Sequence, residues 1–348
     1  MHHLMRTLLL CLLAFNLPAP SSSCTRLVYQ GPNGTVLTAR SMDWKGDIPA
    51  NMWVFPRGME RNGEVGPASV QWKSRYGSVI VSSWDIASSD GMNEQGLVAN
   101  MLWLVESEYP AFTPGGQRRG LSISLWAQYA LDNFANVKEA VEALRKEEFV
   151  VVTDKLPGTD RVATVHLSLS DASGDNAILE YIGGRLTIHH DRSYTVMTNS
   201  PTFDQQLALN AYWQSIGGTV MLPGTNRAAD RFARASFYLK AIPQTDDTRI
   251  AVASVFSVIR NCSVPFGISS ESEPNISNTR WRVVADQRNL VYFYEDVLTP
   301  NAFWVDLKKL DFGPKGKVRK LALAQQQVYS GETSRQFVEA KPFTFMGL

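Results

Sequence analysis

The chain has little cysteine and little histidine, which argues against several kinds of chemistry at once. Its 348 residues include three cysteines and five histidines. The sequence contains no C-x-x-C pair, no H-E-x-x-H helix motif, no G-x-S-x-G elbow, no P-loop and no G-x-G-x-x-G fingerprint. Nothing in it therefore indicates a zinc site, a serine-hydrolase triad, or a nucleotide-binding site. We expect neither a metal nor a cofactor.

The chain also has no large excess of positive or of negative charge. The formal net charge is +1, and Arg6 is the only charged residue in the first 23 positions, so a chain without them carries no net charge. A neutral chain argues against nucleic acid or an anionic membrane as a partner. The basic stretch GPKGKVRK near the carboxyl end is expected to be a solvated loop. Long apolar runs are absent after the first 23 residues, so no membrane anchor is expected.

The first 23 residues have the pattern of a secretory signal peptide. Arg6 supplies the positive start, an apolar run from Leu8 through Phe15 follows, and a stretch rich in proline and serine ends at Ser23. The run is too short to span a bilayer comfortably. We therefore predict a signal peptide over residues 1–23, a mature chain over residues 24–348, and a periplasmic location.

Cys24 stands where this signal peptide would be cut, and three alternatives stay open. The apolar segment can be a buried helix of a cytosolic protein. Cys24 can be the lipidated cysteine of an exported lipoprotein, although Ser21 occupies a position where a lipobox carries leucine or a similar apolar residue. Cys24 can also form a disulfide with Cys262, the other cysteine that would remain.

A hairpin is predicted directly after Cys24. The strand-like runs CTRLVYQ and TVLTARSMDW flank GPNG, and an Asn-Gly pair between such runs is a strong hairpin signal. If Asn33 and Gly34 are the two turn residues, Cys24 pairs with Asp43. Arg40 would then point to the opposite face, unless the strand twists or bulges.

A terminal cysteine contains both halves of a nucleophilic catalyst. The thiol is a weak nucleophile until it loses its proton. The α-amino group has a pKa of about 8 and is a suitable base near neutral pH. Arg40 would favour the thiolate, and the carboxylate of Asp43 would orient the amine. His189 and His190 are interpreted as surface residues in preference to metal ligands.

Four segments together resemble one enzyme family. They are the opening CTRLVYQ…ARSMDW, then SSDGMNEQGLVANMLWL, YTVMTNSPTFDQQL and LPGTNRAADRFARASFY. In this order they resemble the choloylglycine hydrolase family of N-terminal-nucleophile hydrolases, which includes penicillin V acylases and bile salt hydrolases. The likeness is strongest to penicillin V acylases of Gram-negative bacteria, and it covers essentially the whole mature chain.

The resemblance implies roles for individual residues. Cys24 would be the nucleophile, with Arg40 and Asp43 beside its thiol. Asn199 would stabilise the oxyanion, and Arg231 would stabilise charge. Leu102 stands where family members often carry Asn or Tyr, so the second oxyanion donor would be a backbone N–H or Asn100. By resemblance, the residues that line the substrate pocket are Trp44, Trp103 and Leu102.

Each of these residues also has a plainer interpretation. Asn199 before Ser-Pro can simply shape a turn, and Arg231 can be a solvated residue of a helix. Arg40 and Asp43 can be cross-strand partners, and the two tryptophans can be core residues. Their joint occurrence with Cys24 favours the functional interpretation.

The expected fold is α+β, a four-layer αββα sandwich of two antiparallel sheets between helix layers, in one domain over residues 24–348. Helices are expected over residues 121–149, with a break between Asn133 and Asn136, over residues 228–242, and over residues 247–262. The expected reaction is hydrolysis of a linear amide such as penicillin V or an N-acyl homoserine lactone. Conjugated bile salts are the alternative substrate, and a non-catalytic exported lipoprotein is the remote alternative. The resemblance allows a homotetramer, although the stretch that helps bile salt hydrolase subunits assemble looks shorter here.

Overall fold

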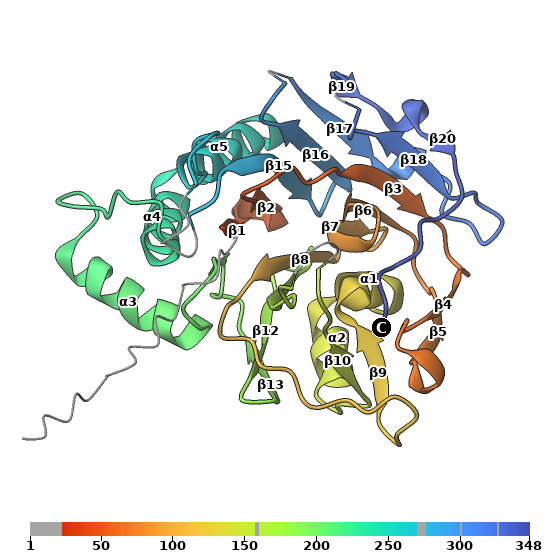
Figure 1. Cartoon of the computed structure of the whole chain (residues 1–348). Helices are drawn as coiled ribbons and strands as arrows, with labels where there is room; N and C mark the ends of the chain where they lie inside the picture. The colour runs from red at the N-terminus through yellow and green to blue at the C-terminus, as the bar shows by residue number, and fades with distance from the viewer. Residues whose placement is uncertain (1–22, 157–159, 270–275, 300, 326) are drawn as a thin grey trace, which may run out of the picture.

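Two large β-sheets lie face to face, with helices covering both outer faces (Figure 1). The computed structural model describes residues 23–156, 160–269, 276–299, 301–325 and 327–348. Of the predicted signal peptide, only Ser23 belongs to the described residues. In the described part of the chain, no helix is long and apolar enough to span a bilayer.

The first sheet has seven strands in the order β14-β1-β2-β15-β16-β17-β19. Neighbours pair antiparallel, except that β17 and β19 run parallel at one edge. Strands β1 and β2 are buried along nearly their whole length, because a helix layer covers one face and the second sheet covers the other. The strands are β1 (Cys24–Gln30), β2 (Val36–Asp43), β14 (Val196–Met197), β15 (Thr279–Asp286), β16 (Val291–Asp296), β17 (Ala302–Asp306) and β19 (Gly331–Glu332).

The second sheet has nine strands in the order β13-β12-β11-β8-β7-β6-β3-β18-β20. These are β3 (Asn51–Phe55), β6 (Ser78–Ser83), β7 (Ala87–Asn93), β8 (Val98–Trp103), β11 (Val165–Ser170), β12 (Asn176–Ile182), β13 (Arg185–His190), β18 (Arg319–Ala322) and β20 (Val338–Glu339). Two small ribbons stand apart, formed by β4 (Glu60–Asn62) with β5 (Gln71–Lys73) and by β9 (Arg119–Ser122) with β10 (Phe149–Val152).

Helices form the two outer layers. On the first sheet, α4 (Ala228–Ala241) and α5 (Thr248–Asn261) pack over β1 and β2, and α3 (Phe203–Ile216) packs against α4. On the second sheet, α1 (Trp126–Asn133) packs on β7 and β8, and α2 (Val137–Leu144) packs on β12. The predicted four-layer αββα sandwich is therefore confirmed.

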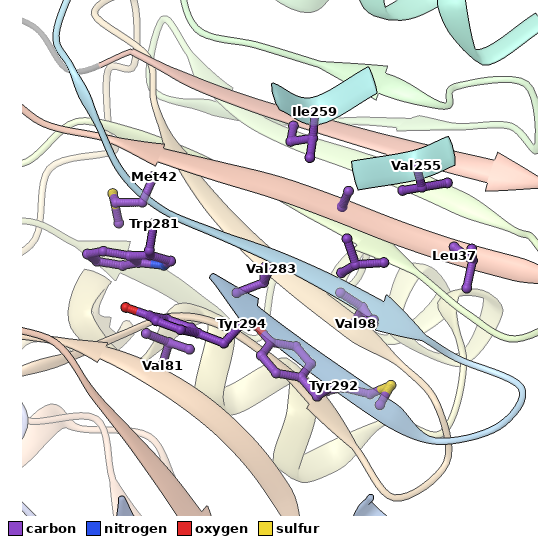
Figure 2. Packing of buried hydrophobic residues seen from close by; sticks show 14 of the residues in the cluster. Leu37, Met42, Val81, Val98, Val255, Ile259, Trp281, Val283, Tyr292 and Tyr294 are labelled. Carbon is purple, nitrogen blue, oxygen red and sulfur yellow. The ribbon is translucent and has the colours of Figure 1, made fainter. Parts of the chain in front are cut away.

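The main hydrophobic core fills the space between the sheets and continues under α5. Figure 2 shows Trp281 and Tyr294 of the first sheet facing Val81 of β6, while Val255 and Ile259 of α5 approach the same sheet from its other side. Side chains of one strand alternate between these two layers. The sheet thus has two buried faces, and a polar group on either face must find a partner there.

The helix break predicted between Asn133 and Asn136 is present, because Asn136 caps α2 by accepting a hydrogen bond from the Glu139 N–H. Asp247 caps α5 in the same way. The stretch before α1 instead forms β9 and a 3₁₀ turn over residues 123–125. Helix α3 is not predictable from the sequence pattern, because its buried side includes the polar residues Gln206 and Asn210 and so gives only a weak apolar stripe.

Candidate active site

Cys24 begins β1, which lies between β14 and β2 in the first sheet, and its side chain is buried. Its Sγ lies 3.6 Å from Arg40 Nη2, 4.0 Å from Met42 Sδ and 3.9 Å from the carbonyl oxygen of Asp43. The backbone nitrogen of Cys24 is here a peptide N–H, because Ser23 precedes it. In a chain cut after Ser23, this nitrogen would be the α-amine.

The hairpin register differs by one residue from the prediction. Cys24 pairs with Met42, not with Asp43, and Gln30 pairs with Val36. The connection is a five-residue loop in which Thr35 N–H donates to the Pro32 carbonyl and Gly31 N–H donates to the Thr35 carbonyl. A two-residue turn was therefore the wrong prediction.

This register puts Arg40 on the same face of the sheet as the thiol, which corrects the predicted opposite orientation. Cys24 pairs with Met42, and Arg26 pairs with Arg40. Cys24 and Arg26 are two residues apart on β1, and Arg40 and Met42 are two residues apart on β2, so all four side chains share one face. No bulge between Cys24 and Arg40 is needed to bring them together. Asp43 lies on the other face, toward α4.

Arg40 is held rigidly between the two sheets. Its Nη1 is 2.6 Å from Asp90 Oδ2 of β7, and its Nη2 donates to the carbonyl of Met101 at 3.0 Å. Asp90 also accepts a hydrogen bond from the Tyr292 hydroxyl. Burial raises the pKa of the Cys24 thiol, whereas the Arg40 cation favours the thiolate and opposes that rise.

Asp43 is a buried carboxyl with one hydrogen-bonded oxygen. Oδ1 accepts from the Thr279 hydroxyl at 2.6 Å, and Oδ2 has no partner among the described residues. Burial raises the pKa of Asp43 to about 6, and the cation of Arg231 opposes the rise. The unpaired oxygen leaves room for a further donor on this side of β2.

Asn199 and Arg231 meet at the backbone of Cys24. The N–H of Cys24 donates to Asn199 Oδ1, and Arg231 Nη2 donates to the same oxygen at 2.9 Å. Arg231 Nη1 also donates to the carbonyl of Cys24 at 2.6 Å and to the Thr25 hydroxyl at 2.6 Å. Arg231 is buried, so its interpretation as a solvated helix residue is wrong.

The loop that carries Asn199 is anchored from two sides. Asn199 Nδ2 donates to the Trp103 carbonyl at 2.7 Å, and Gln206 Nε2 of α3 donates to the Asn199 carbonyl. Next to it, the Thr198 carbonyl lies 2.8 Å from His166 Nε2, while His166 Nδ1 lies 2.9 Å from Glu180. The orientation of Asn199 therefore depends on α3 and on the second sheet.

A largely apolar pocket opens over the thiol. Its empty volume is about 660 Å³, including solvent at its mouth. The Trp44 ring meets the Trp103 and Trp84 rings edge to face at 5.8 and 5.6 Å. The pocket is lined by Cys24, Arg40, Met42, Trp44, Ile48, Ser83, Trp84, Ile86, Ala87, Ser89, Met101, Trp103, Ile123, Ser124, Leu156, Ala163, Val165 and Met346. It could hold an aromatic or alkyl group against aromatic walls.

Leu102 is not among these lining residues. It points into the core between the sheets, because its neighbours on β8, Met101 and Trp103, face the pocket. The prediction that Leu102 contacts substrate therefore finds no support in the structure. Asn100 lies two residues away on the same inner face, opposite Asp90 and Ser168, and does not line the pocket either.

Three residues of the site have no role predicted from the sequence: Asp90, Met42 and Trp84. Asp90 belongs to the SSDGMNEQGL segment, but nothing in the sequence shows that it faces Arg40 across two sheets. Trp84 lies in the turn between β6 and β7, where Trp84 and Asp85 both have positive φ. Asp85 stabilises this turn by accepting hydrogen bonds from Ser82, Asn51, Trp53 and Lys320.

Within the described residues, no three His, Cys, Asp or Glu side chains are placed to hold a metal ion. His190 instead lies 2.8 Å from Asp175, and His189 lies 3.4 Å from Glu180. Cys24 and Cys262 are both free thiols, so the alternative of a disulfide between them is not realised.

Comparison with known proteins identifies the family. Residues 24–320 match the family described as linear amide C–N hydrolases, choloylglycine hydrolase family. The chain belongs to this family. The penicillin V acylase of Pectobacterium atrosepticum is 53% identical over 352 residues, which cover 95% of this chain and 94% of that protein. The chain is therefore a hydrolase of linear amides.

A solved structure and a more distant relative agree with this assignment. The structure of penicillin V acylase from Agrobacterium tumefaciens matches with a TM-score of 0.88 and 61% identity, covering 93% of this chain and all of that one. The bile salt hydrolase/transferase of Clostridium perfringens is 25% identical over 311 residues, covering 82% of this chain and 93% of that protein. The resemblance to the choloylglycine hydrolase family is thus confirmed.

Proposed function

We propose that this amide hydrolase uses Cys24 as an N-terminal nucleophile after residues 1–23 are removed. The observation that carries the proposal is the position of Cys24. Its buried thiol lines the apolar pocket and lies 3.6 Å from Arg40. Its backbone forms hydrogen bonds with Asn199 and Arg231. The family match, which begins at residue 24, supports the same boundary.

Cleavage before Cys24 creates the base that the thiol needs. With Ser23 attached, burial keeps the pKa of the Cys24 thiol high. The backbone nitrogen of Cys24 is then part of a peptide bond and is not basic. The free α-amine accepts the thiol proton, directly or through one water, and Arg40 stabilises the resulting thiolate. The carboxylate of Asp43 lies beside this end of β1 and orients the amine.

The reaction then follows two steps of acyl transfer. The Cys24 sulfur attacks the acyl carbonyl carbon, and the oxyanion is held by Asn199 Nδ2 and a backbone N–H. The C–N bond breaks as the α-ammonium returns its proton to the leaving amine. Water attacks the thioester with the α-amine as base, which releases the acid and restores the thiol. Losing one oxyanion donor typically costs about 2.7–4 kcal/mol of barrier.

The shape of the pocket favours narrow acyl groups. Trp44, Trp84 and Trp103 form aromatic walls at about right angles or steep tilts to one another. A phenoxyacetyl group or an alkyl chain fits between such faces, whereas a steroid is broad and rigid. We therefore propose penicillin V and N-acyl homoserine lactones as substrates, with conjugated bile salts as the alternative.

The proposal includes export and assembly. The charge and apolar pattern of residues 1–23 supports secretion to the periplasm without a membrane anchor. A homotetramer is the assembly proposed from family membership. A lipid on Cys24 would be a membrane anchor and would contradict the proposed location. It would also contradict the mechanism, because lipidation consumes the Cys24 sulfur.

Mass spectrometry of the exported protein tests the processing. We expect a free Cys24 amino terminus, and a diacylglyceryl group on Cys24 would overturn the proposal.

In the processed enzyme, Cys24→Ser should lower turnover of penicillin V by orders of magnitude while melting temperature stays close to the wild type. Protein verified to retain residues 1–23 should be inactive, and full activity in that form would move the base elsewhere.

A further inference from the structure

One pair of buried side chains from the second sheet holds both ends of the loop that carries Asn199. This loop runs from Thr198, directly after β14, to Phe203, the first residue of α3. His166 Nε2 lies 2.8 Å from the Thr198 carbonyl oxygen. The Phe203 N–H donates to the two carboxylate oxygens of Glu180 at 3.1 and 3.2 Å. His166 and Glu180 in turn lie 2.9 Å apart, from Nδ1 to Oε1.

The sheet places this pair on its inner face. His166 belongs to β11 and Glu180 to β12, and these strands pair antiparallel with Leu167 opposite Leu179. His166 and Glu180 are therefore also opposite each other, and opposite residues on neighbouring strands share a face. On its other side His166 pairs with Leu102, which points into the core between the sheets. Both members of the pair are buried.

Both ring nitrogens of His166 face oxygen atoms. A backbone carbonyl has no hydrogen to donate, so Nε2 must carry the hydrogen of its contact with Thr198. Burial opposes the ionisation of Glu180, but hydrogen bonds from His166 and His189 lower the pKa of this carboxyl to about 2. A carboxylate only accepts hydrogen bonds, so Nδ1 also carries a hydrogen. The ring is therefore a cation that pairs with Glu180.

We infer that His166 is a positioning residue for the oxyanion site. The carbonyl that it holds belongs to the planar peptide unit between Thr198 and Asn199, so this contact fixes the direction in which the Asn199 side chain leaves the backbone. The hydrogen bond to Glu180 fixes the ring itself. His166 does not line the pocket, so it acts on the reaction through Asn199. The inference rests on the proposed roles of Cys24 and Asn199.

Two amide substitutions that differ by one methylene group separate the two contacts of His166. In His166→Gln the amide reaches the place of Nε2 and can donate to the Thr198 carbonyl. In His166→Asn it reaches only the place of Nδ1, beside Glu180. In the processed enzyme acting on penicillin V, His166→Asn should lower kcat roughly a hundred-fold, and His166→Gln less than about ten-fold. KM should stay within about two-fold in both variants, because the acyl pocket is unchanged.

Binding of phenoxyacetaldehyde reports on the oxyanion site without turnover. The Cys24 sulfur adds to the aldehyde carbon, and the thiol proton passes to the aldehyde oxygen, which then occupies the oxyanion position. Loss of the titratable thiol follows this reaction. In each variant the dissociation constant should rise by the same factor by which kcat/KM falls, because such an adduct resembles the transition state.

His190→Asn is the matched control. His190 also contacts a carboxylate, with Nε2 2.8 Å from Asp175, but it lies on β13 and makes no contact with the Asn199 loop among the described residues. This variant should keep the wild-type kcat and KM. The melting temperature checks that each variant is folded. Nitrogen NMR of histidine-labelled wild-type enzyme needs no variant of His166 to fold, and it should show hydrogen on both ring nitrogens of that residue.

The outcomes are distinguishable. Equal losses of kcat in His166→Gln and His166→Asn, or no loss in either, would overturn the inference, and so would a His166 ring with hydrogen on one nitrogen. The proposed function would still stand if Asn199→Ala lowers kcat. Normal kcat in Asn199→Ala, or no turnover of penicillin V by the wild type, would instead contradict the proposed function.

Discussion

Arg231 and Asn199 are joined by a hydrogen bond of 2.9 Å from Nη2 to Oδ1, and the same oxygen accepts the N–H of Cys24. Arg231 also donates to the carbonyl of Cys24. One guanidinium group from α4 therefore fixes both the backbone of the proposed nucleophile and the amide proposed to hold the oxyanion. This geometry requires the planar fork of arginine.

Arg231→Lys should lower kcat for penicillin V by about ten- to a hundred-fold, because one ammonium cannot span the Cys24 carbonyl, the Thr25 hydroxyl and Asn199 together. KM should change little, since Arg231 does not line the pocket. Arg234→Lys is the matched control: Arg234 is also buried on α4 but donates to the carbonyls of Pro223 and Thr225. Equal kcat losses in both variants would contradict the assignment.

Asp43 should make the uncleaved protein less stable as pH rises from about 4 to about 6. Burial raises the pKa of this carboxyl to about 6, above its unfolded value of about 3.9. In this window the folded state binds more protons than the unfolded state, so the free energy of unfolding falls with rising pH. Asp43→Asn in the same uncleaved protein should remove this part of the decline, as measured by urea unfolding at several pH values.

The processed protein should show a smaller Asp43-dependent decline, because the new α-ammonium of Cys24 favours the ionised carboxylate. Comparing the wild type with the Asp43→Asn variant, each with and without residues 1–23, isolates this effect from that of other buried acids. A decline of the same size in both forms would contradict the pairing of Asp43 with the amine.

Trp44→Phe and Trp103→Phe should each raise KM for penicillin V about two- to ten-fold, in line with the energy of a lost aromatic contact. Thiol titration of Cys24 should not change, because binding is lost and not chemistry. Trp304→Phe is the control, since Trp304 packs on Phe293 and does not line the pocket. Normal binding in both pocket variants, or a wild-type preference for glycocholate over penicillin V, would show that the pocket is assigned wrongly.

Cys262→Ser should keep activity close to that of the wild type. Cys262 is buried, burial raises the pKa of its thiol to about 12, and its Sγ lies 3.8 Å from the backbone carbonyl of Arg231. Under native conditions we expect one alkylated cysteine, Cys24. A peptide linking Cys24 to Cys262 after non-reducing digestion would disprove this prediction.

Much of the site follows from the sequence alone. The apolar start and Ser23 point to Cys24, and the runs around GPNG predict a hairpin that brings β2 beside it. The side-chain caps of Asn136 and Asp247 begin α2 and α5, because these signals act within one turn of the helix. The four family segments point to Asn199 and Arg231. All of these depend on neighbours close in the chain or on residue order.

The tertiary structure alone decided the register of the hairpin and the facing of its side chains. A Cβ at Gly31 would lie 2.6 Å from the Tyr29 ring and 2.9 Å from the Thr245 carbonyl, so packing against the loop before α5 shapes this turn. A register shifted by one residue from the predicted pairing places Arg40 on the same face of the sheet as the Cys24 thiol, and it places Asp43 on the face toward the helices. The partners that hold these charges, Asp90 for Arg40 and Thr279 for Asp43, come from strands 50 and 236 residues away. A buried charge requires such partners, but which strands supply them depends on how the two sheets stack, and local sequence does not determine that.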